Sequence, residues 1–285
     1  MNAIEQTLEL LRSNRPVIMG ILNVTPDSFS DGGRFIAKQP AVEHALEMQT
    51  QGADIIDVGG ESTRPGAEPV SVDDEISSVV PVIQAIRQHS QIPISVDTSK
   101  PEVMRAAVAA GASLVNDVFA LRAPGAVEVC AELAVPVCLM HMQGEPRSMQ
   151  QHPQYQDVVV EVSEFLLQRA QVCIDQGIAK HSIMLDPGFG FGKTIAHNLQ
   201  MLANIRVFCD LEFPVLVGLS RKSMLGAILD RPVEERLSGS IAAVVLAWQR
   251  GARFFRVHDV AETVDALRLC EAVAAAMNNE KLVPE

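Results

Sequence analysis

Three polar residues stand where apolar runs of the chain end, and their types could recognise a flat polar ligand. Asp97 and Asp186 carry carboxylates, and Asn116 carries an amide with both a donor and an acceptor. Together they could form a metal site, an acid/base pair or a set of acceptors for a ligand rich in N–H groups. A hard metal usually takes more carboxylates or waters. With the cation Lys222, the set suits a heterocycle that presents donors and acceptors along its edges.

Cationic side chains occur in predicted loops and at predicted strand ends. These are Arg64, Arg221, Lys222 and Arg256, with His258 two residues after Arg256 and so on the same face of a strand. In a chain of formal net charge −12, this concentration predicts an anionic substrate group, and phosphate or diphosphate suits it best. Arg256 is the strongest candidate, because an unpaired guanidinium within an apolar strand would be costly. Arg221 is the weakest, since loop arginines are usually solvated.

A glycine-rich stretch at residues 183–194, IMLDPGFGFGKT, invites comparison with a phosphate-binding loop. The P-loop pattern requires a glycine five positions before Gly192, and Pro187 occupies that position. The stretch is therefore interpreted as a tight turn that lets a ligand or another loop approach the backbone. We expect Phe189 and Phe191 to offer apolar walls there.

The elements that must position these residues repeat eight times along the chain. Predicted strands begin near Pro16, Asp54, Pro93, Ser113, Pro136, Ser182, Pro214 and Arg253. A segment of helical composition follows each strand and is long enough for a right-handed crossover to a parallel neighbour. This pattern predicts an α/β fold, a (β/α)₈ or TIM barrel, with an open doubly wound sheet as the competing fold. In such barrels, active sites form at the carboxyl ends of the strands.

Length and composition limit the class of protein. The 285 residues, with 48% apolar residues, suit one barrel domain over residues 1–285, with an N-terminal extension at 1–15 and a C-terminal tail at 278–285. The acidic charge argues against a nucleic-acid or membrane-surface partner. The five cysteines form no C-x-x-C pair, and the N-terminus lacks the order of a signal peptide. These features, and apolar runs too short to span a bilayer, predict a cytoplasmic protein.

Two runs of sequence resemble the paired signatures of the dihydropteroate synthase family. They are IMGILNVTPDSFSDGG at residues 18–33 and GADIIDVGGESTRPG at residues 52–66. The likeness continues at residues 95–98, 116–117, 140–141, 186–190, 220–223 and 256–258. It implies a pterin-binding barrel of the folate pathway, which joins 6-hydroxymethyl-7,8-dihydropterin diphosphate to p-aminobenzoate and releases diphosphate. It also implies a homodimer and a target of sulfonamides.

The resemblance assigns roles by position. Residues that look like pterin contacts are Asp97, Asn116, Met140, Asp186, Gly218, Lys222 and Arg256. Those that look like p-aminobenzoate contacts are Phe29, Thr63, Pro65, Phe191 and Ser220. Those that look like diphosphate contacts are Asn23, Arg64, Arg256 and His258, and Asn23 looks like the ligand of a Mg²⁺ cofactor. The catalytic residues implied are Asn23, Arg64, Asp97, Lys222, Arg256 and His258.

Two other functions stay open at this point. A methyltransferase of the same fold that binds methyltetrahydrofolate would share the pterin contacts, although it is not expected to keep both loop signatures. An inactive pterin-binding paralogue would be expected to carry lesions in the loops. Asn23, Asp27, Phe29, Thr63 and Arg64 are all present, so this alternative ranks lower.

Overall fold

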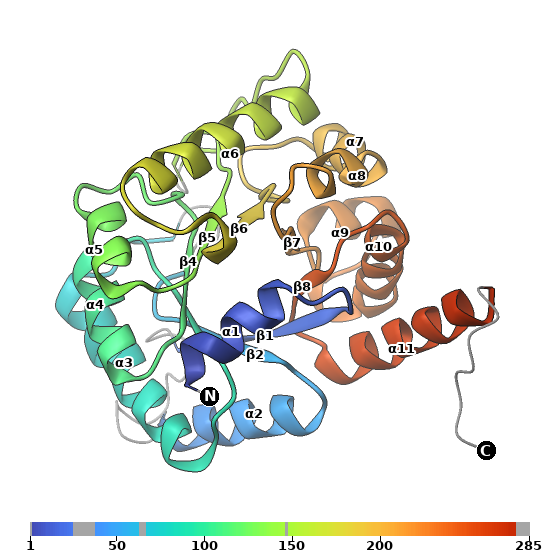
Figure 1. Cartoon of the computed structure of the whole chain (residues 1–285). Coiled ribbons are helices and arrows are strands. Elements are labelled where there is room, and N and C mark those ends of the chain that lie inside the picture. Colours follow the sequence, from blue (N-terminus) through green and yellow to red (C-terminus); the bar gives the residue numbers. More distant parts are fainter. Residues whose placement is uncertain (1, 25–37, 63–66, 146–147, 278–285) are drawn as a thin grey trace.

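Eight parallel strands form one barrel surrounded by helices (Figure 1). The computed structural model describes residues 2–24, 38–62, 67–145 and 148–277. The strands are β1 Val17–Asn23, β2 Ile55–Gly59, β3 Ile94–Asp97, β4 Leu114–Asp117, β5 Val137–Met140, β6 Ile183–Asp186, β7 Leu216–Val217 and β8 Phe254–Val257. Their order is β6-β5-β4-β3-β2-β1-β8-β7, and a parallel bridge between Leu185 and Val215 brings the two outer strands together. The barrel prediction is confirmed.

The helices between successive strands lie outside the barrel, one further helix precedes the first strand, and one follows the last strand. They are α1 Ala3–Leu11, α2 Lys38–Thr50, α3 Val72–His89, α4 Pro101–Ala110, α5 Ala126–Leu133, α6 Val158–Asp175, α7 Ile195–Ala203, α8 Ile205–Cys209, α9 Ser223–Leu229, α10 Leu237–Gln249 and α11 Val260–Met277. Local sequence sets several starts, as where Asp157 accepts from Val159 and Val160 N–H at the N-terminus of α6. In the part of the chain that the structure describes, no helix is long and apolar enough to cross a bilayer.

The core has two layers because alternate residues of each strand face opposite sides. Val17 and Met19 of β1 face the barrel interior, where they pack with Leu114 and Phe254 among others. Ile18 faces outward into the larger cluster between strands and helices. Strands buried on both sides need continuous apolar runs, and this is why the eight predicted strand starts fall within two residues of the observed ones.

Helix α1 covers the amino ends of the strands, across the near end of the barrel in Figure 1. Leu11 packs into the interior cluster with Leu8 and Leu10 beside it. The hydroxyl of Thr7 lies 2.8 Å from that of Ser113, which directly precedes β4. The segment expected to be only an extension therefore closes one end of the barrel, so ligands must enter at the carboxyl ends of the strands.

Candidate active site

Polar residues predicted as a site stand side by side where the strands end. Asp97 on β3 is in register with Asn116 on β4 and with Gly59 on β2. Gly59 is in turn in register with Asn23 on β1. The barrel closure therefore brings residues that are far apart in the sequence to one level of one face, as the prediction required.

Arg256 is paired with two carboxylates from neighbouring strands. Its Nε donates to Asp57 Oδ2 at 2.6 Å, and its Nη2 donates to Asp97 Oδ2 at 2.8 Å. Burial, together with the nearby Asp57, raises the pKa of Asp97 to about 7 although Arg256 opposes the shift. Burial lowers the pKa of Arg256, but the two carboxylates more than offset this and the net direction is upward. The guanidinium expected to need a partner thus has two.

Asp57 is a member of this cluster that was not predicted as a site residue. It is fully buried, it accepts from Asn116 Nδ2 at 3.4 Å, and its Oδ1 has no hydrogen-bond partner. A buried carboxylate oxygen without a partner is costly. Its position at the end of an apolar run was the available signal, but the sequence alone does not say that β2 lies beside β1 and near Arg256.

Asp186 and Lys222 form the opposite side of the site. Asp186 is 5% exposed, and its Oδ1 accepts from Gly188 N–H at 2.7 Å. Burial raises the pKa of Asp186, while the Gly188 N–H and Lys222 oppose the shift. Burial lowers the pKa of Lys222 to about 8, against the attraction of Asp186. The Lys222 Nζ lies 4.3 Å from the centre of the Phe191 ring, a cation–π contact.

The glycine-rich loop after β6 is folded around its own lysine. Lys193 Nζ donates to the carbonyls of Gly188 and Phe191, each at 3.0 Å, and is 3% exposed. It is therefore engaged by the loop and does not project toward a phosphate. Phe191 is half-buried beside the site, but Phe189 is 1% exposed within the core, so the expectation of two apolar walls is wrong for Phe189. Its side chain points inward from the turn.

Ser220 and His258 lie together at the ends of β7 and β8. Ser220 Oγ is 3.0 Å from His258 Nδ1 and accepts from His258 N–H at 3.2 Å. Burial and the nearby Arg256 lower the pKa of His258 to about 4, so the ring is neutral at pH 7. Arg221 instead pairs with Asp259 through Nε at 3.1 Å, in keeping with its low rank as an anion contact.

Other predicted site residues have varied outcomes. Four lie outside the described residues: Phe29, Thr63, Arg64 and Pro65. Met140 is 4% exposed and packs with Val118 and Met142 in an apolar cluster that includes Phe191 at its edge. Gly218 directly follows β7, and a Cβ built there would meet no atom within 4 Å. Met140 therefore belongs to the apolar wall behind the polar groups, and Gly218 leaves space beside the end of β7.

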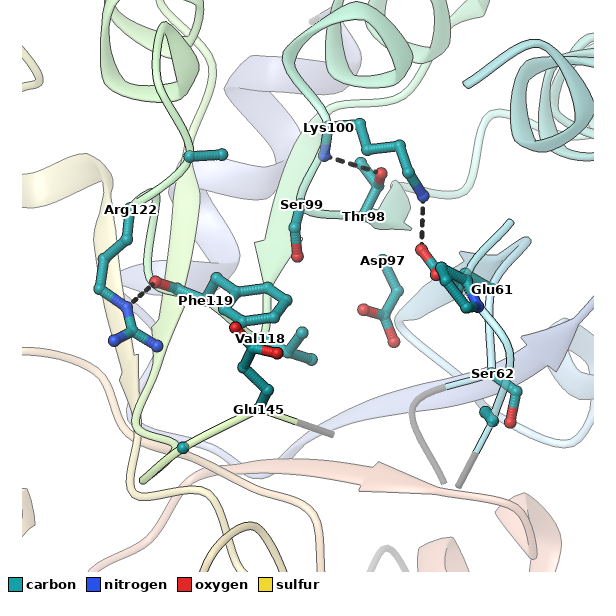
Figure 2. A pocket seen from close by; sticks show the side chains of 14 residues that line it. Glu61, Ser62, Asp97, Thr98, Ser99, Lys100, Val118, Phe119, Arg122 and Glu145 are labelled. Atoms are coloured by element: carbon teal, nitrogen blue, oxygen red, sulfur yellow. Dashed lines mark hydrogen bonds and ion pairs between the residues drawn. The ribbon is translucent and has the colours of Figure 1, made fainter. Parts of the chain in front are cut away.

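A cavity of about 570 Å³ opens beside Asp97, within the size range of small-molecule sites. Figure 2 shows Asp97 between Glu61 and Ser62 on one side and Val118 and Phe119 on the other. The other residues that line the cavity are Ala67, Pro69, Thr98, Ser99, Lys100, Arg122, Ala123, Gly144 and Glu145. Apart from Asp97, these lining residues were not predicted as site residues, because they lie on the connections after β2, β3, β4 and β5, whose proximity depends on the closed barrel.

Lys100 ties two of these connections together. Its Nζ donates to Glu61 and to Glu75, and Glu75 on α3 is fully buried. Glu61 Oε1 in turn accepts from Val70 N–H at 3.1 Å. The ion pairs therefore fix the described ends of the connection between β2 and α3 next to the cavity.

Metal-binding groups are sparse. Across the described ranges, no group of three or more His, Cys, Asp or Glu side chains is arranged to hold a metal ion. Asn23 is exposed at the end of β1. A Cβ built on Gly59 would lie 3.9 Å from Asn23 Oδ1 and 3.8 Å from Asp97 Oδ2, so the glycine leaves open space between these two oxygens. A cation could be held here only with help from a ligand or water.

The sequence has close relatives of known activity. It matches the family described as pterin binding enzyme over residues 19–258. The dihydropteroate synthase of Escherichia coli (strain K12) is 53% identical over 268 residues, which cover 94% of this chain and 95% of that protein. The dihydropteroate synthase of Haemophilus influenzae is 52% identical, with coverage of 92% and 95%.

Solved structures agree with the sequence relatives. Xanthomonas albilineans dihydropteroate synthase with 4-aminobenzoic acid has a TM-score of 0.87 and 54% identity, covering 92% of this chain and 94% of that one. The same enzyme with 7,8-dihydropteroate has a TM-score of 0.84 and 51% identity, with coverage of 92% and 95%. The Yersinia pestis dihydropteroate synthase with a sulfonamide drug has a TM-score of 0.87 and 50% identity, also covering 92% and 95%. This chain belongs to the pterin binding enzyme family, among its dihydropteroate synthases.

Proposed function

We propose that the chain joins 6-hydroxymethyl-7,8-dihydropterin diphosphate to p-aminobenzoate, giving 7,8-dihydropteroate and diphosphate. The observation that carries this proposal is the likeness to dihydropteroate synthases along nearly the whole chain, at about half of all positions. The site supports it, because carboxylate, amide, cationic and aromatic groups stand within one barrel mouth. No other activity is favoured by a particular contact.

The inner acids and amide suit a pterin ring. A pterin carries ring N–H and amino donors next to ring acceptors, and Asp97, Asn116 and Asp186 offer matching groups from three strands. Asp57 Oδ1, buried without a partner, adds negative potential behind them. Met140 and Gly218 then provide an apolar surface for the ring face. A polar heterocycle bound here would give these groups hydrogen bonds in addition to those that they make within the protein.

The reaction requires mainly charge stabilisation. The amine nitrogen of p-aminobenzoate forms a bond to the exocyclic methylene of the pterin, the methylene–oxygen bond to diphosphate breaks, and the amine loses a proton. We infer that departure precedes attack, so that positive charge develops at the methylene near the carboxylates Asp97 and Asp186. Lys222 and Arg256 supply positive charge on the same face for the departing anion. Neutral His258 can donate one hydrogen bond to it.

Magnesium is the cofactor that we propose, and the residues present fit it in a limited way. Mg²⁺ commonly takes one or two protein oxygens, keeps several waters and is completed by substrate phosphates. Asn23 offers one exposed amide oxygen, and Gly59 leaves open space beside it. When bound, the ion would neutralise charge on the diphosphate. The protein residues would still bind and orient both organic substrates.

We also propose a cytoplasmic homodimer. All five cysteines are free, as expected in a reducing compartment. Exposed apolar side chains lie on a run of helices from α7 to α10, namely Ile195, Leu199, Val207, Ile228, Leu229 and Leu246. Sedimentation velocity should give twice the chain mass of 30.8 kDa. A monomer at micromolar concentration would refute the dimer without affecting the proposed reaction.

The test of the reaction is direct. Purified protein with Mg²⁺ and both substrates should form dihydropteroate, detected by mass spectrometry, and a sulfonamide should compete with p-aminobenzoate. An Asp186→Asn variant is the matched control, since it keeps the shape and removes the charge. Pterin binding without any product would favour an inactive paralogue, and methyl transfer from methyltetrahydrofolate would favour the methyltransferase. Either result would refute the proposal.

A further inference from the structure

Lys193 is a buried lysine that hydrogen-bonds to neutral acceptors. Its Nζ lies 2.9 Å from His141 Nδ1, 3.0 Å from the carbonyl oxygens of Gly188 and Phe191, and 3.4 Å from that of His141. Buried lysines are uncommon and are usually paired with an acid. Burial lowers the pKa of Lys193 to about 7, against the attraction of Asp186, and in its charged form the amine has three protons with which it can bridge several acceptors at once. The role of this lysine is not explained by phosphate binding, because the stretch does not match the P-loop pattern.

The four acceptors belong to two segments that meet beside the site. Gly188 and Phe191 belong to the turn after β6, which also closes on itself through Phe191 N–H to the Gly188 carbonyl at 3.1 Å. His141 directly follows β5. Without Lys193, the Phe191 carbonyl would lose this donor, and the Gly188 carbonyl would keep only the Phe191 N–H. Lys193 therefore joins the turn to the end of the neighbouring strand.

His141 is held as an acceptor for this lysine. Its backbone N–H donates to the Asp186 carbonyl at 2.9 Å, and its ring packs edge-on against Phe165 at 4.9 Å between centroids. Burial, Lys193 and Arg122 all lower the pKa of His141, to about 2. The ring is thus neutral, and Nδ1 can accept from the ammonium while Nε2 carries the proton.

The turn carries Phe191, and it is held by other contacts besides Lys193: Gly190 N–H donates to Asn198 Oδ1 at 2.7 Å, and the Tyr155 hydroxyl donates to the Gly192 carbonyl at 2.8 Å. Asp186 belongs to β6 and is held by the sheet ladder. Phe191 follows five residues later, and the turn, with the apolar cluster at whose edge the ring packs, sets the place of the ring under Lys222. Gly190 sits close to the same lysine, since a Cβ there would lie 3.2 Å from Lys222 Cδ. A shift of the turn would therefore displace Phe191 relative to Asp186, whose backbone the sheet ladder holds.

We propose that Lys193 is a positioning residue that, with His141 as its acceptor, fixes the turn presenting Phe191 to the aromatic amine substrate. The proposal rests on the proposed function, because it assumes that the amine binds at Phe191. It assigns Lys193 no contact with either substrate. Loss of the ammonium should weaken p-aminobenzoate binding and spare the pterin, which the strand residues hold.

The experiment compares Lys193→Met with a control, Lys180→Met. Lys180 is 54% exposed and forms a surface ion pair with Glu212. We expect Lys193→Met to raise KM for p-aminobenzoate about tenfold, the order of one lost aromatic contact. Calorimetric affinity for a pterin should stay within about twofold of wild type. Lys180→Met should match wild type in both. Unchanged KM in folded Lys193→Met, or equal losses for both ligands, would overturn the proposal.

Variants at His141 keep the proposal testable if Lys193→Met does not fold. His141→Leu removes the side-chain acceptor, whereas His141→Asn restores an oxygen near the position of Nδ1. KM for p-aminobenzoate should rise in His141→Leu and return toward wild type in His141→Asn. Equal behaviour of the two variants would overturn the role of the acceptor. A wild-type protein that forms no dihydropteroate would instead refute the proposed function, so the two failures are distinct.

Discussion

Replacing Arg256 with methionine should destabilise the barrel strongly, because it removes the only cation bonded to Asp57 and Asp97 in the described part of the chain. Asp57 is fully buried and already has one oxygen without a partner. The Arg256 side chain is 22% exposed, so solvent can replace little of the lost interaction. Methionine fills much of the same space, which separates loss of charge from loss of packing.

The magnitude follows from what remains after the change. Removing one partner of a buried ion pair costs about 3–5 kcal/mol, and here two carboxylates lose the same partner. For a domain of this size, such a loss lowers the melting temperature by roughly 6–20 °C. Arg15→Met is the matched control. Arg15 also binds an aspartate, Asp54, at 2.6 Å but is 51% exposed, so its loss should cost about 1 kcal/mol or less.

Lowering the pH should reduce the loss of stability in the Arg256→Met variant. Burial holds the pKa of Asp97 at about 7 in the presence of Arg256, above its unfolded value, and removal of Arg256 raises this pKa further. The folded variant then binds more protons than the unfolded chain between about pH 4 and its folded pKa, so stability rises as pH falls through that window. Urea unfolding followed by circular dichroism at pH 7.5 and 5.5 measures both effects. A cost no larger than that of Arg15→Met, or one that grows on acidification, would refute this account.

Three further predictions use the same site. Pterin affinity should fall up to about tenfold per pH unit below pH 7, as Asp97 takes up a proton, and Asp97→Asn should flatten this dependence in calorimetry. Gly188→Ala, at φ +70° with a backbone oxygen in the way of the new methyl group, should cost about 2–5 kcal/mol in urea unfolding. Gly177→Ala, at φ +99° with no atom within 4 Å, should cost only about 1–2 kcal/mol. Lys100→Met removes the cation that binds the buried Glu75 and should cost about 3–5 kcal/mol in urea unfolding. A near-neutral effect would contradict this role of Lys100.

The sequence predicts the barrel well because each strand is marked by two local signals, an apolar run and a polar residue at its end. Strands buried on both sides need apolar runs such as residues 17–22, and their ends need polar residues such as Asn23. Both signals are local. Asp97, Asn116 and Asp186 were therefore placed at one face without knowledge of any contact.

Contacts between distant strands could not be predicted in this way. Arg256 was expected to meet an anion, but in the folded chain it binds Asp57 and Asp97, because barrel closure places β8 beside β1 and near β2 and β3. The sequence excluded a P-loop at Lys193 through Pro187, but it did not indicate that the lysine would bond to His141, which is 52 residues away in the chain. In both cases a partner far away in the chain could not be predicted.

The charges at the mouth suggest why this fold can bind a donor-rich ring and an anion together. Burial disfavours the charged form of acids and bases alike, so it moves the pKa of Asp97 up to about 7 and that of Lys222 down to about 8. Each group stays charged only to the extent that an opposite charge or a hydrogen bond stabilises its charged form. The N–H donors of a pterin would stabilise the carboxylates and its diphosphate would stabilise the cations, so the substrate adds interactions that the protein groups do not make among themselves. A ligand that carried only one of these two features would satisfy half of the groups and should bind correspondingly less tightly.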